Sequence, residues 1–121
     1  MSWPTPFLEQ WFSIMDSDDP DRVLDLIATD FVMSVLFSTG GASAEFVGDR
    51  AGLIGYLEQR EKSTLVHNLV AGAVVGDTEL VLGTTTRAGA FEATFNASAQ
   101  IDPSRRVRRL LICRTPELNL S

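Results

Sequence analysis

Four long runs with strand character in the second half of the chain constrain the fold more than any other feature of the sequence. The runs cover residues 64–75, 79–87, 91–101 and 106–114. The pairs between them are residue types suited to tight turns, namely Gly76-Asp77, Ala88-Gly89 and Asp102-Pro103. We therefore predict an antiparallel meander, because short turns join neighbouring antiparallel strands.

Two helix starts precede the meander. Thr5 followed by Pro6, and Asp19 followed by Pro20, each combine a capping side chain with a proline at the first helical position. Apolar residues follow the first start at intervals of three and four residues, which predicts a helix with one apolar face. The second start predicts a short helix that runs to about Ala28.

A hairpin and a third helix are predicted between these helices and the meander. Residues 31–38 and 44–47 are strand-like and flank a turn that contains two glycines. Asp49 then predicts the cap of a helix that runs to about Lys62. Each glycine inside this helix costs about 1 kcal/mol relative to alanine, so the helix either lies against a neighbouring backbone or is marginal. These glycines are Gly52 and Gly55.

The order of these elements predicts an α+β fold, with three N-terminal helices packed on a curved, mostly antiparallel sheet of about six strands. A sheet that curls around one helix has the shape of a cone and leaves a blind pocket at its wide end. The only histidine, His67, lies on the first strand that would line this pocket. At 121 residues the chain fits one domain, spanning residues 1–121.

Composition and charge exclude several classes of partner. Ten basic and sixteen acidic residues give a net charge of −6, which disfavours nucleic acid and anionic membranes. No apolar stretch approaches the ~20 residues that a membrane helix requires. One histidine and one cysteine do not make a zinc site, and we expect neither a metal nor a cofactor. The single Cys113 and a start without signal-peptide character predict a cytoplasmic location.

The two faces of the predicted strands differ between runs. Residues 91–101 alternate strictly between apolar and polar side chains, as expected of a strand with one packed face. The first run is apolar on both faces: one holds His67 with Leu65, Leu69 and Ala71, and the other holds Val66, Val70 and Val74. Because the helices cover only one face of the sheet, we predict a homodimer in which a second copy covers the other.

Three side chains are candidates for acid-base chemistry. Histidine titrates near neutral pH, so His67 is a candidate general acid or base, and a carboxylate such as Asp16 would fix its tautomer. Tyr56 has a phenol that suits a ligand carbonyl or oxyanion. The structural alternatives are a partly buried histidine bonded to a backbone carbonyl, a solvated aspartate after the helix, and a tyrosine that packs its ring.

The expected ligand pocket is lined mostly by apolar residues, as ligand sites usually are. Its expected members come from helices and strands alike: Trp11, Phe12, Met15, Val35, Phe37, Leu53, Leu69 and Arg109. Each apolar residue alone fits an ordinary core position equally well. Arg109 alternates with Val107, Leu111 and Cys113, so it reaches the pocket, a dimer contact or an exposed strand end.

Two segments, DSDDPDRVLDLIATDF and FVGDRAGLIGYL, together with the order of elements, resemble the nuclear transport factor 2-like superfamily and most closely its SnoaL-like branch. The resemblance covers residues 7–114. It implies a cystatin-like α+β cone. The superfamily includes scytalone dehydratase, ketosteroid isomerase, limonene epoxide hydrolase and polyketide cyclases, and also binding and transport proteins without catalytic activity.

The segment TLVHNL resembles the strand of scytalone dehydratase that carries a histidine, which implies a catalytic role for His67. The same resemblance implies that Asp16, near the end of the first helix, orients the ring. The tyrosine pair that holds the catalytic water has no match, because Met15 and a residue near Val35 occupy those positions. The base of ketosteroid isomerase and the arginine-aspartate pattern of the epoxide hydrolase have no counterpart either.

The sequence leaves three functions open. The first is a cofactor-free lyase, isomerase or dehydratase that acts on a small apolar carbonyl or hydroxyl compound, with His67 as general acid or base. The second is a protein that binds a small apolar molecule without converting it. The third is an interaction module whose apolar sheet face serves a partner protein.

Overall fold

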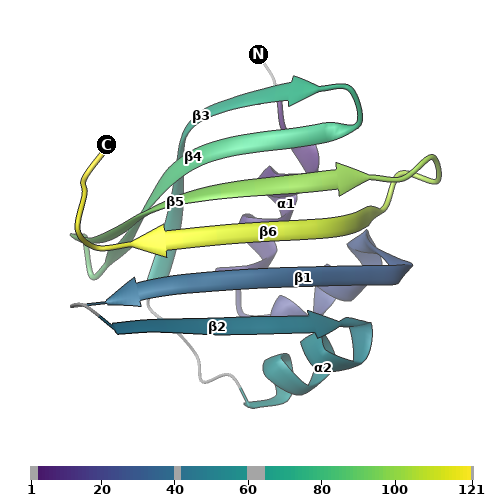
Figure 1. Ribbon diagram of the computed structural model, residues 1–121, viewed down its shortest axis with the longest axis horizontal. Coiled ribbons are helices and arrows are strands. Elements are labelled where there is room, and N and C mark those ends of the chain that lie inside the picture. The colour runs from purple at the N-terminus through teal and green to yellow at the C-terminus, as the bar shows by residue number, and fades with distance from the viewer. Residues whose placement is uncertain (1–2, 40–41, 60–64, 121) are drawn as a thin grey trace.

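The computed structural model describes residues 3–39, 42–59 and 65–120 (Figure 1). The first elements are the helix α1 (Pro6–Met15) and the 3-10 helix η1 (Pro20–Leu26). Next come β1 (Ile27–Thr39), β2 (Ala42–Asp49) and the helix α2 (Arg50–Gln59). The remaining strands are β3 (Leu65–Val75), β4 (Thr78–Arg87), β5 (Ala90–Ile101) and β6 (Val107–Thr115).

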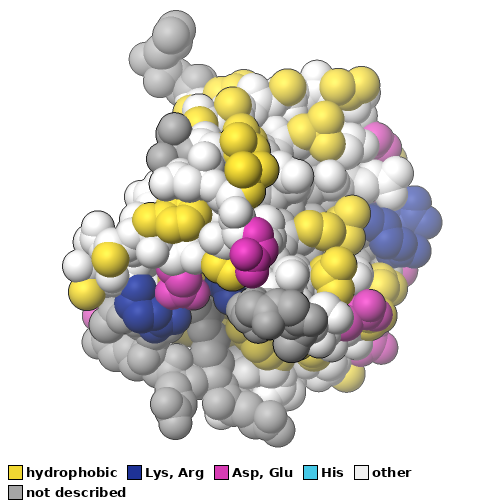
Figure 2. Space-filling view, turned by 60° about the vertical axis from the view of Figure 1, so that its left-hand side comes forward, with side chains coloured by type: hydrophobic (Ala, Val, Ile, Leu, Met, Phe, Trp, Pro, Cys, Tyr) yellow, Lys and Arg dark blue, Asp and Glu magenta, His cyan; other side chains and the backbone are white. Residues whose placement is uncertain are grey.

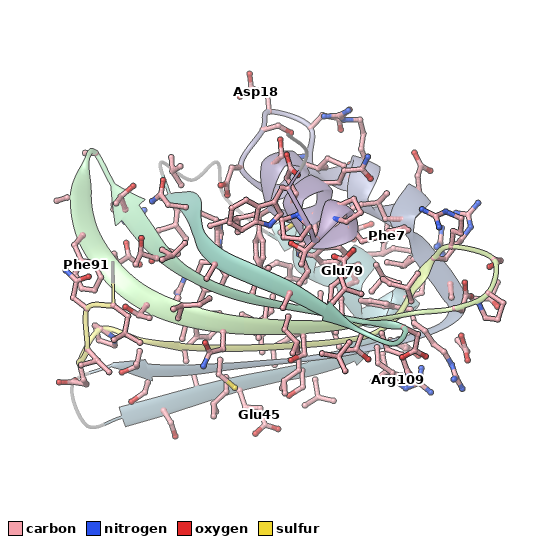
Figure 3. All side chains as sticks on the ribbon, turned by 90° about the horizontal axis from the view of Figure 1, so that it is seen from above. Phe7, Asp18, Glu45, Glu79, Phe91 and Arg109 are labelled. Carbon is pink, nitrogen blue, oxygen red and sulfur yellow. The ribbon has the colours of Figure 1, made fainter. Side chains whose placement is uncertain are left out.

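The strands form a six-stranded sheet in the order β2-β1-β6-β5-β4-β3. β1 pairs with β6 in parallel, and the other neighbouring strands pair antiparallel. Figure 1 shows α1 behind the sheet, and the view from above in Figure 3 shows it on one side of the curved strands. α1 and α2 both contact η1, so the helices lie together on this side, which we call the inner face of the sheet. The opposite side is the outer face.

The predicted α+β fold with a curved, mostly antiparallel sheet is confirmed. The prediction of three N-terminal helices is not confirmed, because the second helix is a 3-10 helix and α2 follows the pair β1 and β2. The sequence pattern placed the end of the second helix at about Ala28. The helix ends earlier, because Ile27 pairs with Val107 of β6 and belongs to the sheet. Lys62, the predicted end of the third helix, lies outside the described residues.

A β-bulge in β3 changes which of its residues share a face. The register between β3 and β4 shifts between Leu69 and Ala71. Beyond the shift Val74 pairs with Glu79, whose carboxylate reaches α1 on the inner face. The predicted outward direction of Val74 is therefore wrong, and so is the predicted position of Ala71 beside His67. One extra residue in a strand reverses the alternation of every side chain that follows it.

The outer face exposes large apolar side chains from several strands. Five of them are 39–48% exposed: Val32, Leu36, Val66, Leu80 and Leu111. In Figure 2, exposed hydrophobic side chains are spread over the visible surface with few charged groups between them. Among the described residues, no helix has both the length and the apolar character that crossing a bilayer requires.

The two glycines inside α2 do not mark a close approach to another segment. A Cβ added at Gly55 would have no described neighbour within 4 Å. At Gly52 the nearest atom would be Asp49 Oδ1 at 3.7 Å, an ordinary contact distance. The same Oδ1 accepts a hydrogen bond from the Gly52 N–H at 3.0 Å, so Asp49 caps the helix as predicted. The glycines therefore lower the helix propensity of α2, and at neither position does a described segment pack so closely that it requires glycine.

The N-terminus of α1 is capped by a distant carboxylate from β4. Thr5, the predicted cap, makes no capping hydrogen bond, and its Oγ1 accepts one from Trp3 Nε1 instead. Glu79 accepts hydrogen bonds from the backbone N–H groups of Leu8 at 2.8 Å and Phe7 at 3.1 Å. Figure 3 shows Glu79 beside Phe7 at the start of the helix. This residue joins α1 to the sheet and satisfies two N–H groups that a helix leaves unpaired.

Replacing Glu79 by alanine is expected to lower the free energy of unfolding by about 3 kcal/mol, because the buried N–H of Leu8 and the partly buried N–H of Phe7 lose their acceptor. Burial raises the pKa of Glu79 above its ordinary value of 4.5, while the N–H donors of Leu8 and Phe7 oppose the rise. The folded protein then holds this proton more tightly than the unfolded chain, so stability falls as pH rises from about 4.5 through the raised pKa.

Denaturant titrations at several pH values check both parts of this prediction. Glu79→Gln keeps one acceptor oxygen but does not titrate, so it should cost less than Glu79→Ala and lose the fall in stability above pH ~4.5. The same pH slope in the wild type and in Glu79→Gln would contradict the assignment.

Candidate functional site

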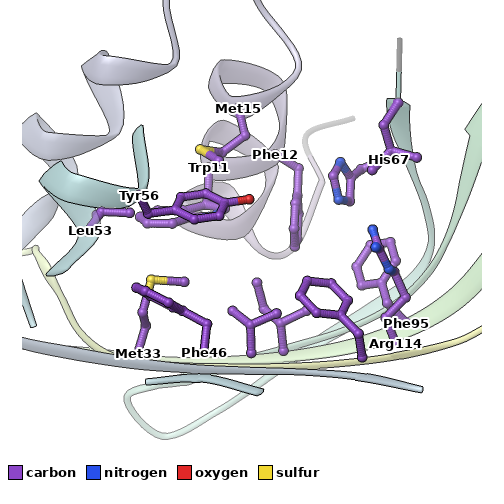
Figure 4. A pocket seen from close by; sticks show the side chains of 14 residues that line it. Trp11, Phe12, Met15, Met33, Phe46, Leu53, Tyr56, His67, Phe95 and Arg114 are labelled. Atoms are coloured by element: carbon purple, nitrogen blue, oxygen red, sulfur yellow. The ribbon is translucent and has the colours of Figure 1, made fainter. Parts of the chain in front are cut away.

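A cavity of about 90 Å³ lies on the inner face, between the helices and the strands (Figure 4). Most of its wall is aromatic or aliphatic. Among the described residues that line it, those with a titratable side chain are His67, Tyr56 and Arg114. A mostly apolar wall with a few polar groups is the usual composition of a small-molecule site.

His67 and Asp16 form the most closely defined polar contact at this cavity. Asp16 Oδ1 lies 2.7 Å from His67 Nδ1, and Asp16 Oδ2 accepts the backbone N–H of His67, also at 2.7 Å. The side chains are only 14% and 13% exposed. Asp16 is the residue after the last turn of α1, and its own N–H donates to Phe12 O at 3.0 Å. The end of the helix thus fixes where the carboxylate meets β3.

This double contact determines how the imidazole is oriented. A carboxylate is an acceptor, so the ring nitrogen that faces it, Nδ1, carries a proton. In the neutral ring the other nitrogen, Nε2, then has a free lone pair. Phe12 stacks on His67 with ring centroids 4.6 Å apart, and Phe95 meets the ring edge at 5.4 Å. With Nδ1 held and both aromatic neighbours in place, Nε2 is the nitrogen left for a ligand in the cavity.

Arg114 contributes a cation to the same wall. It pairs in the sheet with Phe37 of β1 and with Phe95 of β5, so all three side chains lie on the inner face. Its Cζ is 4.3 Å from the centroid of the Phe37 ring, a cation–π contact. Burial lowers the pKa of Arg114 from its ordinary value, and the negative charge of Glu92 partly opposes this change. The guanidinium of Arg114 is therefore only partly solvated.

Tyr56 brings a phenol to the cavity from α2. Its ring is tilted against Phe46 with centroids 5.4 Å apart. Figure 4 shows the Tyr56 hydroxyl directed across the cavity towards Phe12. The side chain is 39% exposed, so it lies where the cavity meets solvent.

The structure places most of the residues expected at the pocket around this cavity. Those that line it are Trp11, Phe12, Met15, Val35, Phe37, Leu53, Tyr56 and His67. Asp16 lies behind His67 rather than in the wall. Leu69 packs against the core without lining the cavity.

Arg109 does not belong to the cavity, and its predicted position there is wrong. Its side chain is exposed and donates hydrogen bonds to the backbone oxygens of Asp30 and Arg108. Arg109 pairs with Val32, which is exposed on the outer face. Sheet register therefore directs this arginine away from the helices.

Six lining residues were not expected from the sequence: Met33, Phe46, Leu65, Phe95, Ile112 and Arg114. The alternation of side chains in β6 indicates the position of Arg114. Leu110 and Ile112 are buried, and Arg114 follows them at the same spacing of two. Side chains two apart on a strand share a face, so this pattern pointed Arg114 inward. Phe95 was recognised only as one member of a packed strand face.

No family model matches the chain, and no curated protein matches it in sequence. Solved structures do match. A proposed polyketide cyclase from Sinorhizobium meliloti has a TM-score of 0.61 and 22% identity over 88% of this chain and 93% of its own. A proposed isomerase of the SnoaL-like family from Agrobacterium tumefaciens has a TM-score of 0.66 and 12% identity over 90% of this chain and 94% of its own.

A nuclear transport factor 2-like protein of unknown function from Burkholderia xenovorans has a TM-score of 0.66 and 11% identity over 96% of this chain and 85% of its own. The chain has the fold of these SnoaL-like and nuclear transport factor 2-like proteins. The resemblance seen in the sequence is thus confirmed for the fold. At these identities a SnoaL-like fold carries no particular activity with it, so function has to be argued from the site.

Proposed function

We propose that this SnoaL-like protein is a cofactor-independent enzyme of the lyase, isomerase or dehydratase kind, acting on a small apolar carbonyl or hydroxyl compound. The observation that carries the proposal is the contact of 2.7 Å between Asp16 Oδ1 and His67 Nδ1 beside an apolar cavity. A histidine whose Nδ1 is bound to a carboxylate presents Nε2 as a base and, once protonated, as an acid.

The chemistry proposed is proton transfer to or from the substrate by His67 Nε2. Asp16 stabilises the imidazolium that forms after the ring takes a proton, as the carboxylate of a catalytic triad does. The Tyr56 hydroxyl is the proposed donor to an oxygen that gains negative charge. The surrounding aromatic wall excludes water, which strengthens each of these interactions.

Two of the similar solved structures are described as a proposed polyketide cyclase and a proposed isomerase, which supports the class of reaction. The cavity limits the size of the substrate. Its volume of about 90 Å³ is below the ~150 Å³ of an engineered apolar cavity that holds benzene. The substrate is therefore a small molecule, or one whose larger part projects from the cavity past Tyr56.

A screen for proton exchange tests this function without knowledge of the natural substrate. Small ketones, aldehydes and hydroxy compounds are incubated with the protein in D2O and followed by proton NMR. We expect deuterium incorporation or elimination for a subset of compounds, and loss of this activity in Asp16→Asn. Compounds that bind in the cavity but show neither exchange nor elimination would instead indicate a binding protein without catalytic activity.

We also propose that the protein is a homodimer in which the outer faces of two copies meet. The support is the set of exposed apolar side chains on that face, which the helices on the inner face do not cover. Sedimentation velocity is expected to give twice the mass of one chain for the wild type. The double substitution Leu80→Lys with Leu111→Lys should give a monomer, because it places like charges in the contact. A wild-type monomer at high concentration would overturn the proposal.

A further inference from the structure

Among the described residues that line the cavity, Arg114 is the one strongly charged group. Within residues 3–39, 42–59 and 65–120, no carboxylate lies within 4.0 Å of its guanidinium nitrogens. Arg114 is partly buried, and a cation withdrawn from water without a paired anion is costly. The Phe37 ring compensates it only through a cation–π contact. The guanidinium keeps several N–H donors available for an acceptor that enters the cavity.

The described carboxylates that bear on this end of the cavity are already hydrogen-bonded to other groups. Glu92 is the carboxylate whose negative charge acts on Arg114, but its Oε2 already accepts a hydrogen bond from Arg87 Nε at 2.8 Å. Asp16, the carboxylate behind His67, is likewise engaged, by the backbone N–H and Nδ1 of His67. An anion in the cavity would therefore meet a guanidinium that no described carboxylate pairs with, and the low local dielectric does little to screen the attraction.

The imidazole of His67 and the guanidinium of Arg114 lie at the same end of the cavity. Figure 4 shows the Arg114 guanidinium directed towards His67, with Trp11, Met33 and Leu53 at the other end. A ligand that satisfies both ends has an apolar body and an anionic oxygen group. A carboxylate matches the planar fork of a guanidinium, since its two oxygens accept two parallel hydrogen bonds.

We propose that the substrate is a small carboxylic acid with an apolar body, and that Arg114 binds its carboxylate beside His67 Nε2. This inference rests on the proposed function, and it names the class of substrate. The apolar end of the cavity, with Trp11, Met33 and Leu53, takes the hydrocarbon part. Bound this way, the carbons nearest the carboxylate lie next to the imidazole.

Binding of matched acids and amides tests the proposal without requiring turnover. The probes are propionate, isovalerate and benzoate, each beside its primary amide, which has the same shape without the charge. Titrations followed by ligand and protein NMR are expected to show the wild type binding each acid about tenfold or more tightly than its amide. Arg114→Met should abolish this preference while leaving amide binding in place, and Arg114→Lys should restore part of it.

Two further variants make the outcome specific. Arg109→Met changes an arginine of the same strand that faces away from the cavity, so it should keep the preference for acids. His67→Gln should keep it as well, which separates carboxylate binding from catalysis. Equal binding of acid and amide to the wild type, or an unchanged preference in a folded Arg114→Met, would overturn the role of Arg114 while leaving the proposed acid-base role of His67 intact. If His67→Gln loses activity and the wild type shows no preference for acids, the acid-base role of His67 stands and the binding of a carboxylate by Arg114 is overturned.

Discussion

His67→Gln is expected to lower turnover by about 10²- to 10⁴-fold on any compound that the exchange screen identifies, because glutamine neither accepts nor delivers a proton at this position. The substitution retains a planar polar group between Phe12 and Phe95. The cavity wall should therefore be preserved, and the effect should fall on kcat more than on KM. Steady-state kinetics with a thermal melt of the variant measures both.

Asp16→Asn serves as the companion variant for this prediction. It keeps the size of the side chain but replaces one carboxylate oxygen by an NH2 group, which is a donor. The two oxygens that accept the His67 backbone N–H and the Nδ1–H are thereby reduced to one. Turnover should fall because the ring loses its fixed tautomer. A His67→Gln enzyme as active as the wild type would show that the imidazole takes no part in the reaction.

Gly83→Ala is expected to lower the free energy of unfolding by about 3 kcal/mol, since an added methyl group would overlap atoms that cannot move freely. A Cβ at Gly83 would lie 2.5 Å from Phe95 Cε1 and 2.7 Å from the backbone oxygen of Asn68. Phe95 is fully buried and packs against both Phe12 and His67. Moving its ring should therefore also weaken ligand binding in the cavity.

The matched control is Gly55→Ala, which adds the same methyl group where no described atom lies within 4 Å. Because alanine favours the helix, this variant should be neutral or more stable by up to about 1 kcal/mol. Chemical denaturation of both variants provides the comparison. Equal stability of Gly83→Ala and the wild type would mean that Phe95 does not pack over Gly83 as described.

The sequence predicted the strands well because their signals are local. Turn pairs such as Ala88-Gly89 fall between β4 and β5, and Asp49 caps α2 as expected. It also brought His67 and Asp16 together as a candidate pair, on the basis of a family resemblance. The two residues are 51 positions apart in the sequence, and the periodicity of a helix or strand does not predict contacts between residues so far apart.

The features that sequence reasoning missed depend on contacts between distant segments. The bulge at Val70 reverses the faces of β3, and only pairing with β4 reveals it. Glu79 caps α1 from 71 residues away, which no local capping rule detects. Arg114 was overlooked in favour of Arg109, although alternation with the buried Leu110 and Ile112 separates the two arginines. Strand register rather than composition decides which charge enters the cavity.

The imidazole of His67 can be observed directly, because the chain has one histidine and gives a single set of ring signals. Long-range proton-nitrogen NMR correlation, at a pH where the ring is neutral, reports which nitrogen carries the proton. The account predicts the Nδ1–H tautomer in the wild type, with an unprotonated Nε2 whose signal moves when benzoate is added, and loss of the fixed tautomer in Asp16→Asn. A proton on Nε2, or a ring whose signals Asp16→Asn leaves unchanged, would contradict the central claim that Asp16 holds His67 as a base facing the cavity.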